Sequence, residues 1–208
     1  MSWVWSTLDL VADLSVTELW DIEASVFDDE PHHSLEGHEI RSAWWDVMEA
    51  VLPGPPSVVA DLGCGTGSMS VLLAQRGYDV VGLDVSPRML DRARAKAQRY
   101  VVPVRFLAGD AADPGLQASS VDVVLTRHVL WALPDPTAVL DRWFDLLAPG
   151  GRLVLVEGRW HTGAGIDSDD LRQLVERMGV TVEVTPLDDP LLWGHPITDS
   201  RYVLTATT

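Results

Sequence analysis

The chain has 208 residues, a length that suits one α/β domain with a full hydrophobic core. Hydrophobic residues make up 47% of it, which argues against intrinsic disorder. Thirty-one acidic residues against fifteen basic ones give a net charge of −16, and this field would repel a phosphate backbone. We therefore expect no nucleic acid, and a cationic or neutral small-molecule partner fits this charge better; plain solubility is the alternative role of the charge.

The cysteine content and the length of the apolar runs indicate the cellular compartment of the protein. Cys64 is the only cysteine, so neither an intrachain disulfide nor a cysteine-rich zinc site can form. The first residues, Met1–Trp5, lack the positive region of a signal peptide, and no run of about eighteen apolar residues is present to span a membrane. These features predict a cytoplasmic protein with no membrane partner.

Two helical patterns come first in the chain. Ser15 and Glu18 have the spacing of a capping box, which predicts a helix through Leu19 that reaches about Val26. The second pattern has a single apolar face, formed by Ile40, Trp44, Val47, Met48 and Val51. Because prolines and a glycine interrupt the chain at 53–56, we expect residues 1–56 to form a helical cap or lid and residues 57–208 to form the main domain.

Strand and helix patterns alternate after this boundary. Strands are predicted at 57–62, 79–84, 104–107, 121–126 and 152–156, and helices at 68–76, 87–99, 135–147 and 167–178. Such alternation indicates a doubly wound α/β fold with a parallel sheet covered on both faces. The last two β-rich runs, 180–186 and 201–206, have no helix between them, so we expect them to pair antiparallel at one edge.

A glycine loop and three carboxylates carry the functional signal. The loop 61–67 has the spacing G-x-G-x-G and joins a strand to a helix, which is the context of a nucleotide-type cofactor site. Asp61, Asp84 and Asp110 follow three successive strands, so they should meet at the switch point of the sheet. A carboxylate there can bind ribose hydroxyls, an amino group or an adenine amine.

Three segments together resemble the cofactor motifs of class I S-adenosylmethionine-dependent methyltransferases. They are Val59–Gly67, Gly82–Leu90 and Gly109–Ala111, and Leu146–Leu153 resembles the segment before that family's fifth strand. The resemblance implies S-adenosylmethionine as cofactor and a Rossmann-like sheet of seven strands, mostly parallel, with an antiparallel terminal pair.

The same resemblance assigns cofactor contacts residue by residue. Gly63, Gly65 and Gly67 would line the methionine part of the cofactor, with Asp61 behind them. Asp84 would bind the ribose. Val85 and Met89 would flank the adenine, and Asp110 with the backbone of Ala111 would hold the adenine amine. Cys64 and Arg127 complete the set. We expect Cys64 to be a packed, unreactive thiol.

The acceptor side is expected after the fourth strand, at Thr126–Pro134. This segment departs from the Asn/Asp-Pro-Pro-Tyr/Phe signature of methyltransferases that modify DNA adenine or protein glutamine, which disfavours those substrates. His128 is a candidate general base, or alternatively a histidine that orders the loop or touches the cofactor. Trp131 is a candidate wall of the site.

Further acceptor contacts are predicted in the lid. The candidates are Trp20, Phe27, His32 and His33, with the two histidines placed in a loop between the first helices. No histidine pair has the spacing of a helical metal site, so no metal is predicted. Only about ten residues separate the fifth strand from the next helix, so the lid must come mainly from residues 15–50 and the acceptor should be small.

Three functions from different classes remain. The first is an O- or N-methyltransferase for a small molecule, with specialised metabolism as one possible setting. The second is a nicotinamide-dependent oxidoreductase, which the G-x-G-x-G spacing and the helix-free terminal pair disfavour. The third is a cofactor-binding regulator or partner protein without transferase activity.

Overall fold

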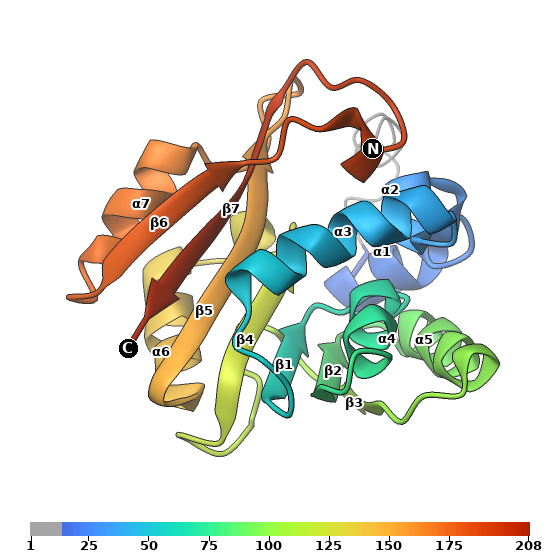
Figure 1. Ribbon diagram of the computed structural model, residues 1–208, viewed down its shortest axis with the longest axis horizontal. Helices are drawn as coiled ribbons and strands as arrows, with labels where there is room; N and C mark the ends of the chain where they lie inside the picture. Colours follow the sequence, from blue (N-terminus) through green and yellow to red (C-terminus); the bar gives the residue numbers. More distant parts are fainter. Residues whose placement is uncertain (1–13) are drawn as a thin grey trace.

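The computed structural model describes residues 14–208, so the features expected within Met1–Trp5 lie outside the described residues. Its centre is a seven-stranded sheet with the order β3-β2-β1-β4-β5-β7-β6 (Figure 1). The strands are β1 (Val58–Leu62), β2 (Asp79–Asp84), β3 (Arg105–Ala108), β4 (Val121–Arg127), β5 (Leu147–Arg159), β6 (Thr181–Pro186) and β7 (Ser200–Thr207). The strands from β3 to β5 are parallel, and β7 runs antiparallel to both β5 and β6. The predicted fold is confirmed.

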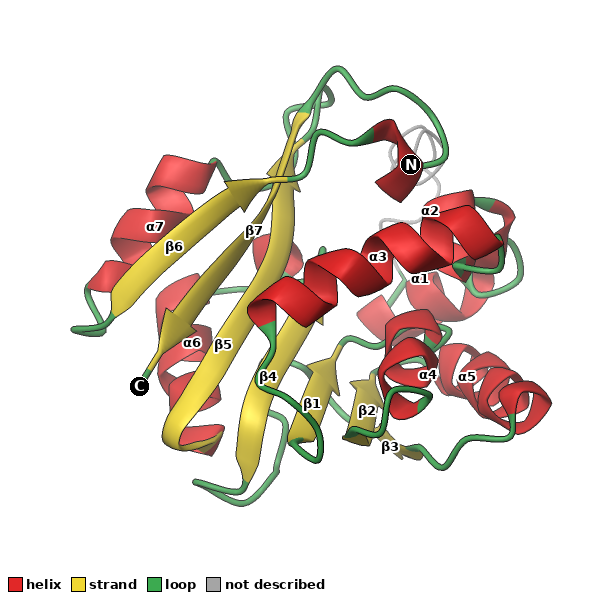
Figure 2. Cartoon of the chain, viewed as in Figure 1, coloured by secondary structure: helices red, strands yellow, loops and turns green. Residues whose placement is uncertain are grey.

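Helices cover both faces of this sheet (Figure 2). They are α1 (Val16–Glu23), α2 (Pro31–Ser34), α3 (His38–Val51), α4 (Ser68–Ala74), α5 (Pro87–Tyr100), α6 (Pro136–Leu146) and α7 (Ser168–Glu176), with short 3-10 turns η1 (Phe27–Asp29), η2 (Leu130–Ala132) and η3 (Pro190–Leu192). Within residues 14–208, no helix is both long and apolar enough to cross a membrane.

The core is divided by the sheet into two clusters. On one face, α6 and α7 pack against Ala60 and Leu155, and on the other, α3 and α4 pack against Val59 and Val154. Because successive side chains of a strand point to opposite faces, a strand buried on both sides must be apolar throughout. The apolar runs of β1 and β5 are therefore explained, and α3 is part of the central core.

Three local predictions differ from the structure. α1 ends at Glu23 rather than near Val26. The segment with His32 and His33 is the short helix α2, which begins with Pro31 at its first position and ends in the left-handed Leu35. β5 does not begin after Gly151, because Leu147 already pairs with Val121 before a register shift absorbs the Pro-Gly-Gly segment.

Candidate functional site

The strand order reverses between β1 and β4, and the functional residues gather beyond the carboxyl ends of these strands. The glycine loop begins there, with the backbone N–H groups of Gly63 and Cys64 donating to the carbonyl of Leu83 at 2.7 and 2.9 Å. Gly67 has φ +74°, and a Cβ at this residue would lie 2.8 Å from Cβ of Ala93. Only glycine therefore allows the loop to turn into α4 while packing on α5.

Two of the three predicted carboxylates flank this loop. Asp61 is buried and accepts a hydrogen bond from Ser70 Oγ at 2.5 Å; burial raises the pKa of Asp61 to about 6, against the opposing effects of Ser70 and Arg127. Asp84 accepts from the backbone N–H of Gly65 at 2.8 Å and of Ser86 at 2.9 Å. Each Asp84 oxygen accepts one of these bonds, so lone pairs remain for a second donor.

The remaining predicted cofactor residues lie around this pair. Met89 is buried, Val85 is half-buried, and Asp110 is exposed with its side chain accepting from the N–H of Ala112 at 2.8 Å. The Cys64 thiol is held at a raised pKa by burial and by the nearby Asp61 and Asp84, which agrees with an unreactive thiol. This donor set fits S-adenosylmethionine, because Asp84 offers oxygens to a ribose and the glycines add no side chains of their own to the loop, although Val129 and Phe27 pack against it.

A lid, defined as residues 16–34 with α1, η1 and α2, covers the glycine loop. Asp21 accepts from Ser86 Oγ at 2.5 Å and from the N–H of Arg88 at 3.1 Å, at the start of α5. Asp28 accepts from Thr66 Oγ1 at 2.6 Å and pairs with Lys96 Nζ at 3.1 Å. Sequence reasoning missed these lid contacts, although Lys96 is the only lysine of the chain.

The predicted acceptor residues of the lid divide into two groups. Phe27 lies on the glycine loop, since its ring would be 3.4 Å from a Cβ at Gly65, and its other neighbours are Trp20 edge-on and His33 stacked at 4.1 Å. His32 instead faces the carboxyl end of β4, where its carbonyl accepts from Arg127 Nη1 at 2.6 Å. Arg127 thus holds the lid, and burial lowers the pKa of its guanidinium to about 10, opposed by Asp61 and Asp28.

His128 stands at the end of β4 in a strained turn. Its φ is +62°, its N–H donates to the carbonyl of Val156 at 2.8 Å, and Trp131 Nε1 donates to its carbonyl at 3.0 Å. Glu157 on β5 fixes the turn by accepting from the N–H groups of Val129 and Leu130 at 3.1 and 2.8 Å. Glu157 is fully buried, and burial raises its pKa to about 8 despite these bonds.

Aromatic side chains surround His128. Its ring is stacked with that of Trp193 at 5.8 Å and meets Trp160 edge-on at 5.2 Å, and Trp131 contacts Trp160 in turn. Burial, with Arg127 nearby, holds the pKa of His128 well below its ordinary value. The imidazole is therefore neutral at neutral pH and can accept a proton.

One histidine group with metal-ligand chemistry lies at the outer side of the lid. Glu30, His32 and His195 each bring a ligand atom to within 4.8 Å of the others, and Glu30 and His195 are exposed. The absence of a resident metal remains a prediction.

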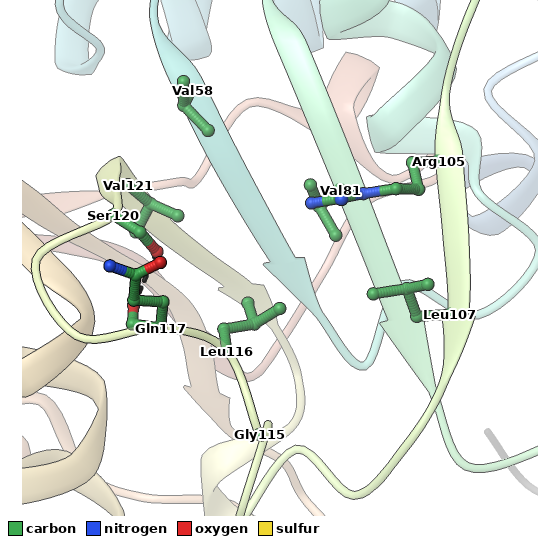
Figure 3. Close-up of a pocket in the computed structure, with 9 residues that line it drawn as sticks. All are labelled: Val58, Val81, Arg105, Leu107, Gly115, Leu116, Gln117, Ser120 and Val121. Carbon is green, nitrogen blue, oxygen red and sulfur yellow. Dashed lines mark hydrogen bonds between the residues drawn. The ribbon is translucent and has the colours of Figure 1, made fainter.

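A separate hollow of about 310 Å³ lies at the amino-terminal side of the sheet (Figure 3). Its lining is mostly apolar and includes Val58, Val121 and Leu116, with Arg105 and Gln117 as polar neighbours. Because β1 and β4 start here, this hollow is at the opposite end of these strands from the glycine loop and has no part in the site.

Comparison with known proteins decides which family this geometry belongs to. Residues 60–155 match the sequence profile of a family described as the methyltransferase domain. This segment is a methyltransferase domain. The match agrees with the motifs of the glycine loop and strand ends, which resemble those of class I S-adenosylmethionine-dependent methyltransferases.

Similar proteins extend this result over part of the chain. An uncharacterized methyltransferase of Mycobacterium tuberculosis is 38% identical over 117 residues, which are 56% of this chain and 45% of that protein. The trans-aconitate 2-methyltransferase of Methylobacterium radiotolerans is 42% identical over 102 residues, 48% of this chain and 37% of that protein. The chain thus matches less than half the length of these relatives. The crystal structure of the [4+2]-cyclase SpnF shares the fold, with a TM-score of 0.70 and 18% identity over 81% of this chain and 80% of that one.

Proposed function

We propose that the chain transfers a methyl group from S-adenosylmethionine to an oxygen or nitrogen atom of a small-molecule acceptor. The observation that carries the proposal is a neutral, buried His128 held at the carboxyl end of β4, next to the strand whose glycine loop and Asp61 form the cofactor side. Its Nε2 is buried and has no hydrogen-bond partner among the described residues.

The chemistry divides between cofactor and protein. When bound, S-adenosylmethionine would supply an electrophilic methyl group to a lone pair of the acceptor, with its sulfur as the leaving group. Residues of the chain orient the acceptor, exclude water and remove its proton. His128 would take that proton at Nε2, while Glu157 acts as a positioning residue through Val129 and Leu130.

The size of the acceptor follows from the lid. Residues 16–34 pack directly on the glycine loop through Phe27 and Asp28, which leaves no open groove there for a polymer. The relatives named above include a trans-aconitate methyltransferase, and a ubiquinone biosynthesis O-methyltransferase of Psychrobacter arcticus is 40% identical over 106 residues. These names support a small acceptor.

A second candidate is binding of the cofactor without methyl transfer. Calorimetry with S-adenosylmethionine, S-adenosylhomocysteine and NAD separates both candidates from an oxidoreductase. A screen for methyl transfer to small hydroxy and amino compounds then separates the two candidates from each other.

Substitution of His128 tests its role as the base. His128→Asn is the sharper variant, because asparagine tolerates a positive φ whereas alanine would add strain at +62°. We expect kcat to fall by roughly 10²–10³ with little change in cofactor affinity, since only proton removal is lost. The exposed His38→Asn is the matched control and should be as active as the parent. A fully active His128→Asn enzyme would end the general-base assignment.

A further inference from the structure

The carboxyl ends of β4 and β5 concentrate buried polar atoms that have no partner. Within residues 14–208 six such side-chain atoms are present, namely His32 Nδ1, Thr126 Oγ1, His128 Nε2, Glu157 Oε2, Trp160 Nε1 and Arg201 Nη1. Folded proteins leave few buried polar atoms unpaired, because each costs free energy. Their concentration around one turn therefore points to a polar ligand that completes them.

Contacts with the ring of Trp193 join three members of this polar cluster, which is defined as those six residues. The guanidinium of Arg201 lies 4.1 Å from the ring centroid of Trp193, and the rings of His32 and His128 lie 5.7 and 5.8 Å from it. Trp160 meets His128 on another side. His32 belongs to the lid and the other five residues to β4, β5, β7 or their ends, so a ligand here would lie between lid and sheet.

Hydrogen-bond donors dominate the cluster. Arg201 uses Nε and Nη2 on Asp199, at 2.8 and 3.3 Å, which leaves Nη1 unused. Trp160 Nε1 can only donate. Burial raises the pKa of Glu157 to about 8, so at neutral pH its unpartnered oxygen belongs to a protonated carboxyl that can donate as well.

The charges in this region disfavour a cation. Arg201 is balanced by Asp199, whose side chain is also buried, and Glu157 is neutral. Arg127 adds a positive charge beside His32, and the sulfonium of the cofactor adds another. The carboxylate of Glu30 lies on the exposed outer side of His32, so an ammonium group on the inner side would meet these charges without a partner, whereas a carboxylate would be attracted.

We propose that the polar cluster is the acceptor-recognition site, and that the acceptor is a hydroxylated aromatic carboxylic acid and not an amine. Its carboxylate would accept from Arg201 Nη1 and Trp160 Nε1, and its ring would lie against Trp193 and Trp160. Its hydroxyl would point to His128 Nε2, which takes the proton as the oxygen gains the methyl group and the sulfonium becomes a neutral thioether. This assignment rests on the proposed function.

Three matched probes test the proposal on the full chain saturated with S-adenosylhomocysteine. The probes are 3-hydroxybenzoate, 3-hydroxybenzyl alcohol and 3-hydroxybenzylamine, which share the ring and hydroxyl and differ in charge. We expect the benzoate to bind at least about tenfold more tightly than the amine, as the loss of one charge-assisted hydrogen bond would give. With S-adenosylmethionine, the product should be the methyl ether.

Two variants test whether the polar cluster causes the preference for the benzoate. Trp160→Phe keeps the ring and removes one donor, and the double variant Arg201→Gln/Asp199→Asn removes the guanidinium without leaving Asp199 buried and unpaired. Each should weaken benzoate binding about tenfold and leave the alcohol nearly unchanged. Trp45→Phe, a half-buried tryptophan of α3 beside Tyr78, is the control and should change neither.

The outcomes separate this inference from the proposed function. If the chain fails to bind S-adenosylhomocysteine, the proposed function itself is wrong. If it binds that cofactor product but prefers the amine, the acceptor class is wrong. If it binds none of the probes, or binds the benzoate equally well in the two variants, the polar cluster is not the acceptor-recognition site.

Discussion

Asp84 ties the glycine loop to β2 through the N–H of Gly65 and still has oxygen lone pairs directed to the crevice side. Asp84→Ala should weaken S-adenosylmethionine binding by about 2 kcal/mol, because a bound ribose loses charge-assisted hydrogen bonds. Calorimetry measures this directly. Asp79→Ala, at the exposed start of the same strand, is the control. Equal affinities for the two variants would remove Asp84 from the cofactor site.

The placement of the predicted cofactor residues could be foreseen because their signal is local. Asp61, the glycines and Asp84 each follow a strand within a short motif, so sequence alone places them together. Glu157 and Arg201 were missed because only the pairing of β5 with β7 brings them to His128. The sequence does contain a signal for Glu157, because it is a single acidic residue directly after the apolar run 153–156. It contains none for Arg201.

The lid is fastened at its centre by a buried ion pair. Lys96 is 7% exposed and binds Asp28, Thr66 and Ser68, at 3.1, 3.1 and 2.5 Å. Lys96→Met should loosen the lid, because Asp28 then keeps as its cation only the more exposed Arg92, whose Nη1 lies 4.0 Å from the Asp28 carboxylate. We expect faster amide hydrogen exchange across residues 16–34 with unchanged exchange in β1 and β4.

Arg99 gives a matched control for this experiment. It lies on the same helix and pairs with Glu36 at 2.6 Å, but both side chains are largely exposed. Exposed ion pairs contribute only about 0–1 kcal/mol, so Arg99→Met should leave the exchange of the lid as it is. If both variants behave alike, the Lys96 network does not hold the lid.

Helices and strands with a clear repeat of apolar residues could be predicted from the sequence, and elements that depend on tertiary contacts could not. α3 and the five parallel strands follow directly from apolar spacing. The helix α2 has only four residues and packs against the turn after η3, where a Cβ at Gly194 would lie 2.9 Å from Pro31. That close approach brings Trp193 and His195 to the lid, so the connection from β6 to β7 also contributes to covering the site, beyond the predicted residues 15–50.

The whole molecule carries a net charge of −16, yet three of its acids, Asp61, Asp84 and Glu157, are buried beside the site. Burial raises the pKa of Asp61 to about 6 and that of Glu157 to about 8, so both hold protons more tightly when folded than when unfolded. A raised pKa contributes stability at low pH that is lost as the pH rises through the folded value. The pH dependence of folding therefore reports on the state of the site.

Glu157→Gln isolates one of these two groups. Glutamine keeps an oxygen that can accept from Val129 and Leu130, but it never ionises. The parent protein should lose folding stability as the pH rises from 4.5, the ordinary pKa of a glutamate, to about 8, the pKa of Glu157 in the folded state, and the variant should not. Across this range, the free energy of unfolding of the variant should rise relative to that of the parent protein by on the order of a few kcal/mol. Urea unfolding at a series of pH values measures this difference. Asp61 is present in both proteins and cancels in the difference. A difference that stays constant with pH would mean that Glu157 is already ionised at neutral pH, and the acceptor site would then lose one of its three donors.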